Sequence, residues 1–173
     1  MEPELDPISQ VHNGLLDLLA DHPLLAERIR PGNWVRYDSA APEKDEISNA
    51  DVPELRLVPT GDVSNLSASS TSGELYKTWR LDIATGDRRV SEHLFPLEWA
   101  ALCALQRWPE LRSLEWNGAG AFVRSVQVID HAEGQFDRDL LRGIAGWTVA
   151  FTIRVHITMP RLAMLDWYDG EES

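Results

Sequence analysis

The longest run of strict alternation in the chain, GWTVAFTIRVHITMPR at residues 146–161, restricts the fold more than any other sequence feature. Apolar side chains occupy every second position from Trp147 to Met159. Threonines, one alanine, Arg154 and His156 lie between them. A period of two over this length is typical of a β-strand with one buried and one polar face. We therefore expect a sheet whose polar face carries Arg154 and His156 toward water or another subunit.

The other periodic segments predict a mixture of helices and further strands. Asp6 and Pro7 are suited to the N-cap and first position of a helix, and Pro23 is expected to split that helix. The expected elements, in order, are a helix at 7–29, strands at 34–38, 52–59 and 75–87, a helix at 95–108, and strands at 121–130 and 146–161. This order predicts one α+β domain over residues 1–173, with an antiparallel or mixed sheet of about four to five strands packed against two main helices.

Four segments have the composition of connections rather than of core elements. The acidic, proline-marked segment at 39–51 is expected to be a mobile surface loop. The segment at 60–74 is rich in Ser, Thr and Gly, which predicts a mobile loop or the tip of a long hairpin. A polar connection with one helical turn is expected at 131–146. The acidic end, at 166–173, is expected to be a frayed tail.

The charge of the chain limits the kinds of partner it suits. The formal net charge is −12, and residues 1–60 contain twelve acidic against five basic side chains. Tight nucleic-acid binding depends on Lys and Arg neutralising phosphates, so this balance disfavours it. No apolar run approaches the roughly 20 residues that cross a bilayer, and the acidic start does not resemble a secretory signal. We expect synthesis in the cytosol and no membrane partner.

The local patterns that usually accompany catalysis are not found in the sequence. GAGAF at 118–122 is rich in glycine but leads into an expected strand and lacks the Lys-Ser/Thr pair of a phosphate-binding loop. Cys103 lies in a helical pattern and is interpreted as a small apolar side chain. DHAE at 130–133 offers weak cation binding, but a solvated loop is the favoured interpretation. We expect no enzyme, no catalytic residue, no cofactor and no metal site.

The seven tryptophans separate into two groups. Trp79, Trp99, Trp108 and Trp147 lie at or beside apolar positions of expected elements, which favours core packing for most of them. Trp34, Trp116 and Trp167 lie beside turns or in the tail, which makes them candidates for a contact surface.

The order and local texture of the elements, over roughly residues 7–160, resemble the tail terminator proteins of long-tailed bacteriophages. The resemblance is carried by the opening helix ISQVHNGLLDLLADHPLLAERI, the segments PGNWVRYD and DVPELRLVP, the strand YKTWRLDIATGD and the helix starting near FPLEWAALCAL. It implies a structural virion protein without catalysis, which forms a ring, typically a hexamer, at the neck. Such a ring caps the tail tube, stops its polymerisation and docks the head–tail connector or stopper protein, while DNA passes through the lumen without specific binding. No contact residue is carried over from the family, because its contacts have no fixed motif.

A cyclic ring needs two different complementary faces on each subunit. Acidic residues dominate the first 60 positions, whereas Arg88 and Arg89 lie together after the expected central strand. We therefore select Arg88, Arg89, Arg154, His156, Trp34 and Trp116 as candidate residues of a subunit or partner interface. A small cytosolic α+β adaptor domain that binds one protein partner is the alternative interpretation.

Overall fold

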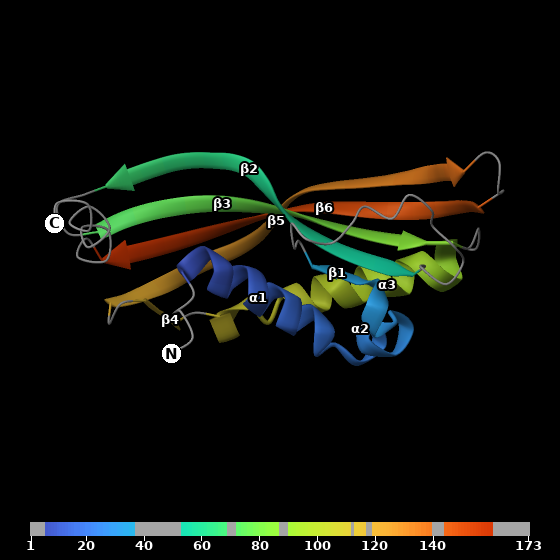
Figure 1. Cartoon of the computed structure of the whole chain (residues 1–173), viewed down its shortest axis with the longest axis horizontal. Helices are drawn as coiled ribbons and strands as arrows, with labels where there is room; N and C mark the ends of the chain where they lie inside the picture. Colours follow the sequence, from blue (N-terminus) through green and yellow to red (C-terminus); the bar gives the residue numbers. More distant parts are fainter. Residues whose placement is uncertain are drawn as a thin grey trace, which may run out of the picture.

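The computed structural model describes residues 6–36, 53–68, 72–86, 90–111, 113–116, 119–139 and 144–160. Helices pack along one face of a long twisted sheet (Figure 1). The helical elements are α1 (Pro7–Ala20), α2 (Pro23–Arg28), the 3-10 helix η1 (Pro31–Asn33), α3 (Val90–Leu105) and the 3-10 helix η2 (Trp108–Leu111). The strands are β1 (Trp34–Arg36), β2 (Glu54–Ala68), β3 (Ser72–Thr85), β4 (Ser113–Trp116), β5 (Ala119–Asp139) and β6 (Ile144–Pro160). The predicted α+β class is confirmed.

The first helix begins and ends for the reasons that the sequence suggested. The Asp6 carboxylate accepts hydrogen bonds from the backbone N–H groups of Ile8 and Ser9, at 2.9 and 3.0 Å. This satisfies two of the backbone donors that a helix leaves unpaired at its start. The helix then stops at Ala20, and α2 starts at Pro23, so the predicted split is confirmed.

Within the described residues, the sheet has six strands in the order β1-β2-β3-β6-β5-β4, one more than the upper end of the predicted range. The β1–β2 pair is parallel and every other pair is antiparallel, so the sheet is mixed. Strand β6 lies at the centre and pairs with β3 without a break from Trp147 to Pro160. This central strand is the segment whose alternation was the strongest sequence signal.

Two predicted connections are strands in the structure. The expected loop at 60–74 is wrong for 60–68 and 72–74, which belong to β2 and β3. The long-hairpin alternative is therefore right, and residues 69–71 lie outside the described residues. The expected polar connection at 131–146 is also wrong for 131–139 and 144–146, because β5 continues to Asp139 and β6 already starts at Ile144, and residues 140–143 lie outside the described residues. The predicted loop at 39–51 and the tail at 166–173 lie outside the described residues.

The core lies between the helices and one face of the sheet. Its fully buried side chains come mainly from α1, α3 and the central strands, and they include Val11, Leu15, Leu19, Leu94, Trp79, Leu81, Phe151 and Ile153. Leu25 of α2 and Leu55 and Leu57 of β2 are also fully buried. The second main helix, α3, starts earlier than predicted and contains Pro96. Cys103 on this helix is half-buried rather than fully buried.

Candidate functional site

The second face of the sheet is the first candidate for a contact surface. In β6, Val149, Phe151, Ile153, Val155 and Ile157 are buried against the helices, as the alternation predicted. The residues between them point to the opposite face, which no helix in the described part of the chain covers (Figure 1). We call this the open sheet face and define it by Glu74, Tyr76, Arg80, Asp82, Thr152, Arg154 and His156. Its side chains are hydroxyl, charged and aromatic groups, which suits a polar contact better than a core.

His156 is held in place on the open sheet face by residues of β3. Its ring stacks on Tyr76, with the ring centroids 4.4 Å apart, and its Nε2 lies 3.8 Å from Glu74 Oε2. Arg154 lies two residues before it and pairs in register with Thr78 on β3. The structure therefore brings Arg154 and His156 onto one face, as predicted.

The charged groups around these residues are partly neutralised within the subunit. Arg80 Nε lies 2.8 Å from Asp82 Oδ1 on the same strand. Near the other end of the sheet, Arg124 donates from Nε to Thr158 Oγ1 at 3.1 Å and lies over the Phe122 ring. The side chains of Arg80 and Arg124 are thus positioned by neighbouring residues of the same subunit.

Trp34, another predicted contact residue, does not join this surface. Trp34 is half-buried, and its indole N–H donates to the backbone oxygen of Ile29 at 3.2 Å. Trp34 on β1 and Trp116 on β4 also lie in strands at opposite edges of the sheet, so they do not form one patch on a subunit. The side chain of Trp116, together with Arg88, Arg89 and Trp167, lies outside the described residues.

An aromatic surface that the sequence interpretation missed lies on α3. Trp99 is 69% exposed and Phe95 is 46% exposed, whereas Trp79 is completely buried. The prediction of core packing for most of the four tryptophans is confirmed by Trp79, Trp108 and Trp147, and Trp99 is the exception. We call Phe95 and Trp99 the aromatic pair. Helical spacing could have predicted this pair. Phe95 and Trp99 are four residues apart and share one side of α3, whereas the buried Leu97 and Ala101 lie on another side.

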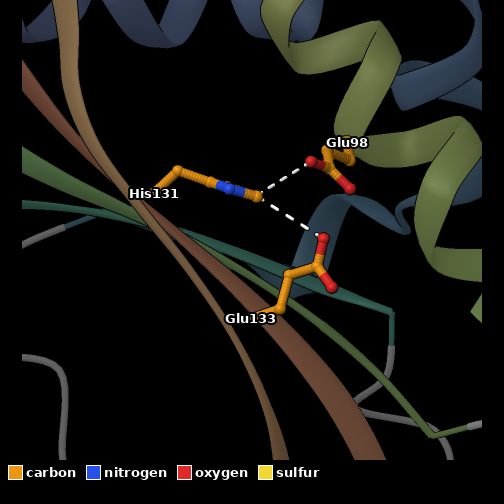
Figure 2. Close-up of side chains that lie close together, drawn as sticks. All are labelled: Glu98, His131 and Glu133. Atoms are coloured by element: carbon orange, nitrogen blue, oxygen red, sulfur yellow. Dashed lines mark ion pairs between the residues drawn. The ribbon is translucent and has the colours of Figure 1, made fainter.

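A cluster of ionisable side chains joins α3 to β5. Nε2 of His131 lies 2.9 Å from Glu98 Oε1 and 3.7 Å from Glu133 Oε1. Figure 2 marks both ion pairs with dashed lines. Glu98 follows the turn of α3 that carries Phe95 and directly precedes Trp99. The sequence placed His131 and Glu133 in a solvated loop, but they lie on a strand and point toward the helix. Their juxtaposition with Glu98 depends on helix–sheet packing, which local spacing does not report.

No protein-family model matches the sequence, and no curated protein matches it. Within the described residues, no helix has the length and apolar character needed to cross a membrane.

Proposed function

We propose that this chain is a structural assembly protein of the tail terminator type. Its subunits form a ring, a hexamer in this proposal, that caps the tail tube in the virion neck, stops tube polymerisation and docks the head–tail connector. The resemblance in element order supports this function, as does the α+β architecture of a mixed sheet with two main helices on one face.

The observation that carries the proposal is the presence of two chemically different candidate contact surfaces on one subunit. The aromatic pair lies on the helical layer, and the open sheet face lies on the other layer of the fold. A closed ring uses head-to-tail contacts, each of which joins two different surfaces. An exposed Trp is also a typical anchor of protein interfaces, where aromatic and Arg side chains contribute most of the binding energy.

In this proposal, the aromatic pair of one subunit packs on the open sheet face of the next. Arg154 and Arg80 then lie within reach of the indole face of Trp99, which attracts cations. The net charge of −12 suits a ring whose lumen lets DNA pass without tight binding, because few cations are available to hold phosphates.

The adaptor alternative is favoured by the aromatic pair alone. A domain that binds one partner needs one contact surface, and the exposed Trp99 provides an anchor for it. The adaptor function gives no reason for a second contact surface on the sheet, and we therefore prefer the ring.

Native mass spectrometry of the purified protein, together with negative-stain microscopy of its mixture with short tail tubes, tests the proposal. We expect closed rings or caps at one tube end from the wild-type chain. Trp99→Ser and Arg154→Glu each remove one of the two surfaces, so each variant alone should be monomeric. In a mixture, the aromatic pair of Arg154→Glu can still pack on the open sheet face of Trp99→Ser. The remaining surfaces of both subunits are altered, so we expect heterodimers but no rings.

The matched control is Arg30→Glu, which makes the same charge change at an exposed position between α2 and β1. It should still form rings. A wild-type chain that stays monomeric and does not bind tubes would overturn the ring proposal. Capture of one defined partner that Trp99→Ser abolishes would then establish the adaptor function.

A further inference from the structure

The Glu98, His131 and Glu133 cluster has the composition of a metal-binding site. His131 and Glu133 are two positions apart on β5, and their register partners on β6 are the buried residues Phe151 and Val149. Both side chains therefore lie on the helix-facing side of the sheet. Glu98 approaches them from α3, so the three ligand groups converge from two elements (Figure 2).

The distances in the cluster match those between ligands of one small cation. The oxygens of Glu98 and Glu133 lie 2.9 and 3.7 Å from His131 Nε2, and all three ligand atoms lie within 4.8 Å of one another. Zinc bonds of about 2.0–2.1 Å in tetrahedral geometry place neighbouring ligand atoms about 3.3 Å apart. The cluster therefore needs only small side-chain adjustments to surround such an ion.

The His131 ring is already oriented for binding. It stacks against Phe151, with the ring centroids 5.2 Å apart, which restricts its rotation. The Glu98 side chain is only 17% exposed, so it too has limited freedom, whereas His131 and Glu133 are each 42% exposed. The site is thus built on a helix and a strand and opens to solvent on one side, where water can complete the coordination.

Charge supplies a reason for a dication at this position. Two carboxylates converge here in a chain of net charge −12, and a single imidazole Nε2–H donates to only one acceptor at a time. A divalent cation interacts with both carboxylates and with the imidazole lone pair together. A nitrogen ligand combined with carboxylates favours Zn²⁺ and similar transition metals over Mg²⁺ and Ca²⁺, which prefer all-oxygen sites.

We propose that Glu98, His131 and Glu133 bind one divalent transition metal ion of the Zn²⁺ class, with water in the remaining position. The ion connects α3 to β5 through side chains of both elements. Asp130 is not a ligand in this proposal, because it pairs with Thr152 on the open sheet face and accepts a hydrogen bond from the backbone N–H of His131.

Calorimetric titration of the full chain with ZnCl₂, after treatment with EDTA and removal of the chelator, tests the site. We expect one ion per chain, no competition from excess Mg²⁺, and visible absorption typical of tetrahedral Co²⁺ when CoCl₂ replaces ZnCl₂. Glu98→Gln, His131→Gln and Glu133→Gln should each weaken Zn²⁺ binding at least about tenfold, since even changes in residues behind the ligands weaken metal binding by about that much.

His156→Gln is the matched control, because His156 also lies near one carboxylate but lacks a second one among the ion pairs of the described residues. It should bind Zn²⁺ like the wild-type chain. Circular dichroism of each variant establishes that it is folded, and the two Glu→Gln variants give the answer if His131→Gln does not fold. Absence of Zn²⁺ binding by the wild-type chain, or undiminished binding by the folded ligand variants, would overturn the proposal.

Discussion

Tyr76 and His156 stack their rings on the open sheet face, with centroids 4.4 Å apart and an angle of 16° between the planes. The two residues are directly opposite one another on β3 and β6. The strands therefore fix the position of both rings within a subunit. A contact surface whose side chains are already ordered loses less conformational entropy when it binds.

The Tyr76–His156 stack should contribute measurably to stability. Cross-strand pairs of this kind are worth about 0.2–1 kcal/mol. In a double-mutant cycle with Tyr76→Leu and His156→Leu, we expect a coupling energy in that range, measured by urea unfolding. The pair Thr152 and Arg80, which is also opposite in register, provides a control cycle with Thr152→Ala and Arg80→Ala. A coupling of zero for Tyr76 and His156 would show that the stack does not stabilise the fold.

Sequence periodicity predicted the open sheet face because the information that determines it is local in the sequence. A period of two in 146–161 separates the buried positions from Arg154 and His156, and strand geometry then places these two on one side. The same reasoning fails for 60–68, where serines and threonines have little to bury. That segment is a strand because β3, which alternates strongly, provides its hydrogen-bonding partner in a hairpin.

The Glu98–His131–Glu133 cluster could not be predicted from the sequence for a different reason. Nothing near His131 or Glu133 indicates that α3 lies against β5, since that contact is set by the packing of the whole helical layer. The polar character of 131–139 also hid the strand. This part of β5 pairs with β6 along one edge only among the described residues, and edge strands often carry charged side chains.

Truncation of Trp79 and of Trp99 should change the free energy of unfolding by very different amounts. Trp79 is completely buried, and Trp79→Ala should lower the free energy of unfolding by about 3–5 kcal/mol because it leaves a large cavity. Trp99 is 69% exposed, and Trp99→Ala should change the free energy of unfolding by no more than about 0.5 kcal/mol. Urea unfolding in the Arg154→Glu background, where the proposed ring contact is removed, measures both. A loss of several kcal/mol for Trp99→Ala would place that indole in the interior.

The pKa of Glu110 should depend on Arg107. Two hydrogen bonds, from Arg107 Nε and Nη2 to the two carboxylate oxygens, hold the pKa of Glu110 below its ordinary value of 4.5, and the charge of Arg107 acts in the same direction. The folded-state pKa is thus lower than the unfolded one. The stabilisation is present above the unfolded pKa and is lost as the pH falls through the folded pKa.

Arg107→Gln should therefore raise the pKa of Glu110, and NMR titration of the Glu110 side-chain carboxyl carbon measures it. Arg28→Gln, at an exposed position at the end of α2, should leave the Glu110 titration unchanged. Equal titration of Glu110 in the wild-type and Arg107→Gln chains would contradict the role of the ion pair.

Gly14 leaves the space that Leu111 occupies between α1 and η2. A Cβ at position 14 would lie 2.6 Å from Leu111 Cδ2, so Leu111 must move if any larger residue is introduced. Ala in place of Gly within a helix normally stabilises by about 1 kcal/mol. Forcing extra volume into a packed contact costs about 1–3 kcal/mol, which offsets that gain. Gly14→Ala should thus be neutral or destabilising in the wild-type chain, yet stabilise by about 1 kcal/mol in a Leu111→Ala background, as urea unfolding would measure.

Gly32→Ala is the control, since nothing lies within 4 Å of the added Cβ, and it should change stability by no more than about 0.5 kcal/mol. The same gain from Gly14→Ala in both backgrounds would mean that Leu111 does not restrict position 14.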